Sequence, residues 1–153
     1  MGSSGNVLIV TAEFYQEISS ELEAGARDFL DDKGITYTRV SVPGAFEIPA
    51  AVKMGYASER FGGFIALGCV IRGETSHYDY VCSESARGLS DLALRYNLPI
   101  GYGILTVENH DQAWVRASRE NGNKGGKTAA ACIQMMSLKD KLIIKDKKSL
   151  TEN

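Results

Sequence analysis

Short runs of β-branched and aliphatic residues alternate along this chain with longer amphipathic segments, and this alternation limits the folds available to it. Residues 6–11 (NVLIVT) are almost entirely apolar and too few for a helix, which predicts a strand buried on both faces. Between Ile18 and Leu30, apolar residues recur at helical spacing with charged residues between them, and Gly34 follows where a helix would end. A strand followed by an amphipathic helix is the repeating unit of parallel sheets.

The same unit recurs to the end of the sequence. Apolar runs predict further strands over 35–42, 64–71 and 99–107, and helical patterns cover 48–58, 78–97, 111–119 and 127–141. Right-handed crossovers between such strands give a three-layer α/β/α sandwich with a four-stranded parallel sheet, a flavodoxin-like arrangement. The length of 153 residues suits one domain, 1–153, with flexible ends over 1–5 and from about 143 to 153.

Charge balance and cysteine pattern argue against several classes of protein. With 19 acidic and 17 basic residues the net charge is −2, so the chain lacks the basic excess that favours binding to nucleic acid or anionic membranes. No run approaches the ~20 apolar residues of a membrane span. Cys69, Cys82 and Cys132 are odd in number and widely spaced, which indicates neither a disulfide framework nor a zinc site. We therefore expect a cytoplasmic protein with no nucleic-acid or membrane partner.

In open parallel α/β sheets, ligands bind beyond the carboxyl ends of the strands. The segment 68–79 leaves the third expected strand and enters a helix, whose first amides suit an anion, and it contains His77. Imidazole is the side chain best suited to proton transfer near neutral pH. A structural interpretation stays open, in which Thr75 or Ser76 caps the helix and His77 is a surface residue of its first turn.

The end of the second expected strand also carries candidate ligand contacts. Phe46 could stack on a flat heterocycle while the Glu47 carboxylate bonds to its edge. The spacing alone favours a plainer interpretation, in which Pro43-Gly44 forms a turn, Phe46 is a core residue and Glu47 is a favourable charge in the first turn of a helix.

Two other patterns are excluded by their spacing. Residues 121–128 end in Gly-Lys-Thr like a phosphate-binding loop, but Asn121 stands where that loop needs its leading glycine, and the segment follows a helix. It therefore predicts a flexible connection between two helices. His77 and His110 stand in different segments without metal-ligand spacing, so no metal is expected.

Three stretches at expected strand ends or loops give the chain a specific resemblance: VPGAFEIP (42–49), LGCVIRGETSHYD (67–79) and GILTVEN (103–109). Over about 6–142 the sequence resembles the lumazine synthase family. The resemblance implies condensation of 5-amino-6-(ribitylamino)uracil with 3,4-dihydroxy-2-butanone 4-phosphate, which gives 6,7-dimethyl-8-ribityllumazine, inorganic phosphate and water. It implies no cofactor and no metal.

Matched by motif, the resemblance also implies roles for individual residues. The uracil substrate is assigned to residues at or just after the ends of the first three expected strands: Phe14, Ala45, Phe46, Glu47, Cys69, Val70 and Ile71. The phosphate of the second substrate is assigned to Glu74, Thr75 and Arg116, with Lys124 as a basic residue nearby. His77 would transfer protons, which the loss of water requires.

Tyr102 matches a family position that touches the pyrimidine, yet it stands near the start of the fourth expected strand, at the opposite end of the sheet from His77. A neighbouring subunit must then supply it, as in the family's homopentamers with shared active sites, some of which pack into shells. The short segment before Asn6 favours a free pentamer, although the uninterrupted connection Asn121-Gly122-Asn123 would allow the shell. The alternative is a non-catalytic paralogue that binds riboflavin or lumazine, against which the retained His77 and Arg116 argue.

Overall fold

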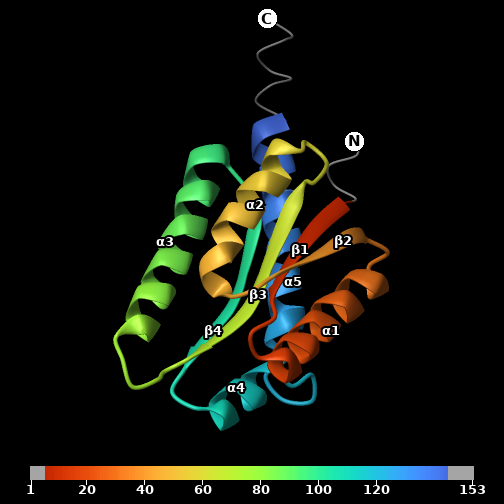
Figure 1. Ribbon diagram of the computed structural model, residues 1–153. Helices are drawn as coiled ribbons and strands as arrows, with labels where there is room; N and C mark the ends of the chain where they lie inside the picture. Colours follow the sequence, from red (N-terminus) through yellow and green to blue (C-terminus); the bar gives the residue numbers. More distant parts are fainter. Residues whose placement is uncertain (1–5, 145–153) are drawn as a thin grey trace, which may run out of the picture.

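Four parallel strands form a single sheet between two layers of helices (Figure 1). The computed structural model describes residues 6–144, so the expected flexible end 1–5 lies outside the described residues, as does the other, about 143–153, from residue 145 onward. The strand order is β2-β1-β3-β4. The four strands span β1 Asn6–Ala12, β2 Thr36–Val42, β3 Gly63–Ile71 and β4 Ile100–Val107. The predicted three-layer sandwich is confirmed, and each predicted strand is found within a residue or so of its expected bounds.

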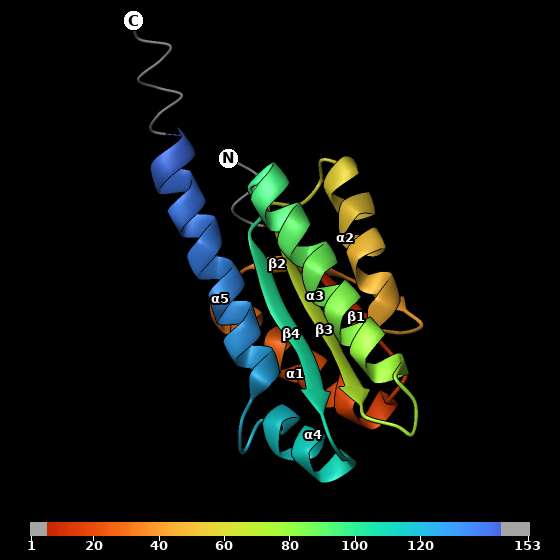
Figure 2. The same cartoon turned by 90° about the vertical axis from the view of Figure 1, so that its left-hand side faces the viewer.

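Helices cover both faces of the sheet (Figure 2). Each face has its own apolar core. On one face lie α1 (Gln16–Asp32), α4 (His110–Ala117) and α5 (Lys124–Lys139); on the other lie α2 (Ile48–Ala57) and α3 (His77–Tyr96). A π-helical turn, Asp140–Ile144, continues α5. Within residues 6–144 no helix has the length and apolar character needed to cross a bilayer.

Apolar runs of the sequence form β1 and β3, the two central strands of the sheet. All of β1 except Asn6 is buried, and so is all of β3 except Ile71, because helices cover both faces there. The more polar run Thr36–Val42 forms the edge strand β2, which pairs with β1 alone and is largely exposed.

The prediction of a flexible connection over 121–128 is wrong from Lys124 onward, where α5 begins. Asn123 ends the connection in a left-handed conformation (φ 47°), and its side chain accepts a hydrogen bond from the Gly126 amide at 3.4 Å. Gly125 is buried against α1, and a Cβ atom there would lie 1.8 Å from the backbone oxygen of Leu22. Gly125 therefore serves close packing of two helices, which needs a residue without a side chain.

Candidate active site

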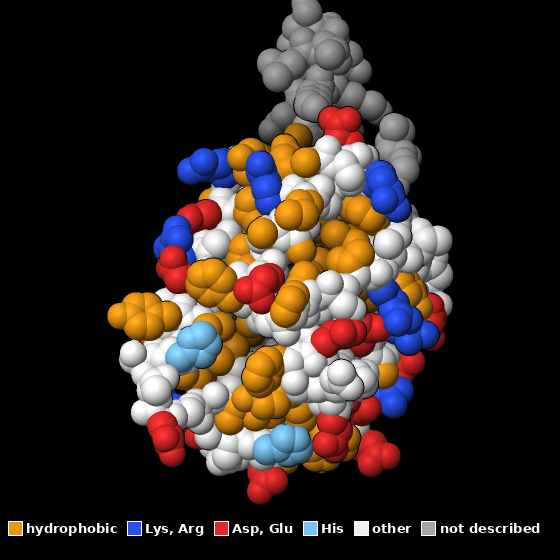
Figure 3. All heavy atoms as spheres, viewed as in Figure 1, with side chains coloured by type: hydrophobic (Ala, Val, Ile, Leu, Met, Phe, Trp, Pro, Cys, Tyr) orange, Lys and Arg blue, Asp and Glu red, His pale blue; other side chains and the backbone are white. Residues whose placement is uncertain are grey.

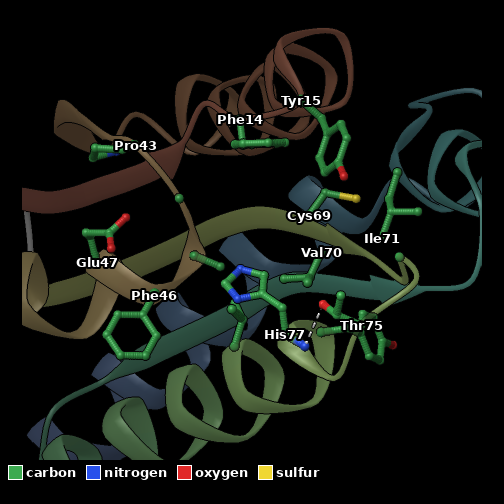
Figure 4. A pocket seen from close by; sticks show the side chains of 15 residues that line it. Phe14, Tyr15, Pro43, Phe46, Glu47, Cys69, Val70, Ile71, Thr75 and His77 are labelled. Carbon is green, nitrogen blue, oxygen red and sulfur yellow. Dashed lines mark hydrogen bonds between the residues drawn. The ribbon is translucent and has the colours of Figure 1, made fainter.

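A pocket of about 540 Å³ lies where the carboxyl ends of β1, β2 and β3 meet (Figure 4). This volume falls within the range of ~300–1,000 Å³ typical of small-molecule sites. The connection after β1 leads to α1 on one face, and those after β2 and β3 lead to α2 and α3 on the other, so the pocket occupies the point where the sheet changes its direction of winding. The lining comes from four segments: Phe14, Tyr15; Pro43, Gly44, Ala45, Phe46, Glu47; Cys69, Val70, Ile71, Gly73; and Thr75, His77, Tyr78, Val81.

Two phenylalanines present their rings to the pocket rather than to the core. Phe14 is 73% exposed and Phe46 is 56% exposed, which is unusual for side chains of this size. The interpretation of Phe46 as a core residue is therefore wrong: it lies in a 3-10 turn, Ala45–Glu47, that turns it outward. Exposed aromatic rings at the mouth of a concave site suit a flat aromatic ligand.

The end of β3 forms one wall of the pocket, with Cys69, Val70 and Ile71 in succession. Cys69 is buried, and burial raises the pKa of its thiol to about 11. The thiol is therefore protonated near neutral pH, which makes Cys69 a wall residue rather than a nucleophile. Burial, and secondarily Cys69, also raises the pKa of the Tyr15 hydroxyl above its ordinary value.

His77 begins α3, and its ring stands in the middle of the pocket view in Figure 4. Its amide donates a hydrogen bond to Thr75 Oγ1 at 3.2 Å, whereas Ser76, at the N-cap position, makes no side-chain cap. The sequence left two interpretations of His77 open, a residue of a ligand site and a surface residue of the first helical turn, and each is correct in part. Thr75 bonds to the helix start, and His77 is an exposed first-turn residue that nevertheless lines the pocket.

The pocket is poor in positive charge. Glu47, at the N-cap of α2, supplies the one carboxylate among the lining residues of the pocket. None of these lining residues is Lys or Arg. On the face of the molecule shown in Figure 3, hydrophobic side chains gather centrally while Lys and Arg lie nearer the margins. Across residues 6–144 no three His, Cys, Asp or Glu side chains are grouped to hold a metal ion.

Four residues named in the sequence analysis do not line this pocket: Glu74, Tyr102, Arg116 and Lys124. Tyr102 is the third residue of β4, opposite Ala66 of β3, far from the carboxyl ends of both strands. Arg116 lies in the last turn of α4, where its Nη1 donates to the backbone oxygen of Gln112 at 3.0 Å. Lys124 is the first residue of α5.

Sequence reasoning assigned no ligand contact to six of the lining residues: Tyr15, Pro43, Gly44, Gly73, Tyr78 and Val81. Tyr15 lies next to Phe14 and packs edge-on against it at 4.9 Å between ring centroids. Tyr78 follows His77, and Val81 stands one helical turn after it. Only Val81 had a sequence signal, helical periodicity, since residue i+4 faces the same side of a helix as residue i.

The fold and the pocket together define an α/β protein of the doubly wound kind, with a site for a flat small molecule at the carboxyl edge of its sheet. The family model described as 6,7-dimethyl-8-ribityllumazine synthase matches residues 4–140. The chain therefore belongs to the lumazine synthase family.

Curated relatives are similar in sequence to this chain along nearly its whole length. The 6,7-dimethyl-8-ribityllumazine synthase 1 of Rhizobium meliloti is 50% identical over 142 residues, which cover 90% of this chain and 93% of that protein. The 6,7-dimethyl-8-ribityllumazine synthase of Agrobacterium fabrum is 49% identical over 145 residues, 92% of this chain and 98% of that protein. The 6,7-dimethyl-8-ribityllumazine synthase of Paramagnetospirillum magneticum is 44% identical over 143 residues, which cover 89% of this chain and 95% of that protein.

Proposed function

We propose that this chain is a 6,7-dimethyl-8-ribityllumazine synthase, a transferase of riboflavin biosynthesis. It would condense 5-amino-6-(D-ribitylamino)uracil with 3,4-dihydroxy-2-butanone 4-phosphate and release phosphate and water. The observation that carries the proposal is the pocket at the carboxyl edge, where two exposed rings, Phe14 and Phe46, flank an exposed histidine in a chain of this family. Its three free cysteines suit a reducing compartment, the cytoplasm.

The uracil substrate fits the apolar half of the pocket. Phe14 would stack on the pyrimidine, and the β3 end from Cys69 to Ile71 would offer backbone groups to its edge. Glu47 can accept hydrogen bonds from ribityl hydroxyls, and Ala45 and Phe46 would flank the same chain. Positioning of this kind converts a reaction between two molecules into one within a complex, which lowers the barrier without any covalent step on the enzyme.

His77 would move the protons that the condensation requires. The amine attacks the ketone carbon, and the resulting hydroxyl must gain a proton before it leaves as water. Thr75, whose hydroxyl accepts the hydrogen bond of the His77 amide, would meet the phosphate together with the first amides of α3. Glu74, which does not line the pocket in one copy, would approach the same phosphate through its backbone amide, because its carboxylate would repel the anion.

The phosphate needs cations that the pocket of one chain does not contain. We propose that Tyr102, Arg116 and Lys124 act from a neighbouring copy in a homopentamer, which completes each site. Complementation provides the test: the impaired variants His77→Ala and Arg116→Ala are unfolded together, refolded together and assayed. Shared sites predict recovered activity in the mixture, and activity no higher than that of either variant alone would refute sharing.

The reaction itself is tested by mixing the two substrates with the protein and recording the lumazine chromophore. The expected result is a rate proportional to protein concentration, with one phosphate released for each lumazine formed. Binding of riboflavin without product would instead support the non-catalytic paralogue. Phosphate release without the lumazine chromophore would refute both.

A further inference from the structure

Arg72 connects three elements at the edge of the pocket. It is the first residue after β3, and its amide donates to the Val107 backbone oxygen at 2.9 Å, beyond the last paired residues of β3 and β4. Its Nε donates to Glu108 Oε2 at 3.0 Å, and its Nη1 lies 3.5 Å from Asp79 Oδ1 in the first turn of α3. The guanidinium carbon lies 4.2 Å from the ring centroid of Tyr78. The contacts of one side chain thus join the ends of β3 and β4 to the start of α3.

The segment that leads from Arg72 to His77 has few other anchors in the described structure. Residues 72–77 are all exposed, and a Cβ atom added to Gly73 would have no neighbour within 4 Å. Ser76 makes no side-chain cap, and the Thr75 hydroxyl bonds to the His77 amide, which belongs to the same segment. A loop held by so few contacts takes its position from its two ends.

Arg72 does not line the pocket, and its guanidinium is engaged by the carboxylates of Glu108 and Asp79. It contacts Tyr78 and Asp79, the two residues that follow His77 in the first turn of α3. Arg72, Asp79 and Glu108 are each about half exposed, and exposed ion pairs contribute little to global stability. Their geometry matters more, because the guanidinium is a rigid fork that fixes the relative positions of its partners.

We propose that Arg72 is a positioning residue that holds the first turn of α3, and with it His77 and Thr75, at the working distance from a substrate bound against β3. The inference rests on the proposed function, since it concerns the placement of the proton-transfer group. A misplacement of about 1 Å can cost ~100-fold in rate. Phe14 and Phe46, which we propose to bind the uracil substrate, lie on other segments, so we expect them to keep their positions when Arg72 is changed.

The test is steady-state kinetics of Arg72→Ala, Arg72→Lys and Asp79→Asn with both substrates. For Arg72→Ala we expect kcat to fall ~10-fold, with KM for the uracil substrate within about twofold of the wild-type value. Arg72→Lys keeps the charge but loses the fork, so it should recover part of the rate. Asp79→Asn should lower kcat in the native background and have little effect beside Arg72→Ala, because residues that act through one contact are not additive.

Arg87→Ala is the matched control. Arg87 is also an exposed arginine with two carboxylate partners, Glu84 and Asp91, but all three lie within α3. Arg87→Ala removes the same charge and the same number of ion pairs as Arg72→Ala. It leaves the contacts between the start of α3 and the sheet unchanged. Equal kinetics of Arg72→Ala and Arg87→Ala would overturn the proposal, as would a rise in the uracil KM as large as the fall in kcat.

Amide hydrogen exchange gives a second measurement that does not depend on catalysis. In Arg72→Ala, exchange should become faster across 73–80 and stay unchanged in the middle of α3, whereas unchanged exchange across 73–80 would refute the positioning role. A wild-type protein without synthase activity would refute the proposed function and leave this measurement to decide the inference. Should Arg72→Ala not fold, Arg72→Lys and Asp79→Asn are measured in the same way and decide it.

Discussion

Replacement of Gly125 by alanine tests the close packing of α5 on α1. A Cβ atom at this position would lie 1.8 Å from the Leu22 backbone oxygen and 2.7 Å from its carbonyl carbon, while ordinary contact begins at 3.4 Å. Because the obstacle is backbone, the two helices must separate by more than an ångström. Overpacking typically costs ~1–3 kcal/mol, and contact with backbone places Gly125→Ala at the upper end. The better helix propensity of alanine returns ~1 kcal/mol.

The net expectation is a loss of about 2 kcal/mol in the free energy of unfolding, or a Tm lowered by about 4–8 °C for a chain of this length. Thermal and denaturant unfolding followed by circular dichroism measure it. Lys127→Ala is the control, because Lys127 is exposed in the same first turns of α5 and its change should stay within ~0.5 kcal/mol. A Gly125→Ala protein as stable as wild type would show that this segment is the flexible connection suggested by its composition.

Three further predictions concern the pocket. His77→Ala should lower kcat by ~100-fold without abolishing turnover, since orientation of the substrates remains; His110→Ala, which changes the other histidine, should match wild type in the same assay. Phe14→Ala should weaken riboflavin binding ~10-fold in a fluorescence titration, and Phe14→Tyr, which keeps the ring, should not; unchanged affinity in Phe14→Ala would remove the ring from the binding site. The free energy of unfolding should fall as pH rises from 9.0 toward about 11, because an unfolded Cys69 thiol ionises in this range while the buried one stays protonated. Denaturant midpoints across this pH range should fall less in Cys69→Ala, and an equal fall would contradict the raised pKa.

The sequence predicted the elements well because burial on both faces leaves a strong pattern. The apolar runs that became β1 and β3 had no polar residues in their interiors, so the sequence predicted the place and length of both strands. Local composition misled at 121–128, where glycine suggested flexibility. The requirement for glycine at 125 comes from Leu22, about a hundred residues earlier in the chain, and no local pattern contains such a contact.

The candidate site was predictable to the extent that topology determines it. The rule that ligands bind beyond the carboxyl ends of parallel strands selected the segments that line the pocket. The rule does not predict how each side chain is oriented. Phe46 has the residue type of a core position, and its exposure depends on the 3-10 turn before α2. The contacts of Arg72 were missed for a similar reason, because Glu108 and Asp79 converge on it from different elements.

The charge of the pocket explains why the proposed reaction would need more than one copy of the chain. The uracil substrate is an uncharged ring with hydroxyls, and a pocket with two aromatic rings and the Glu47 carboxylate suits it. The second substrate carries a phosphate dianion, which the same carboxylate would repel in the absence of Lys or Arg among the lining residues. Cations supplied from a neighbouring copy would place the anion at the open side of the pocket, next to the start of α3. His77 would then lie at the boundary between the two substrates, where a small displacement of α3 alters its distance to both, and this is the displacement that the contacts of Arg72 oppose.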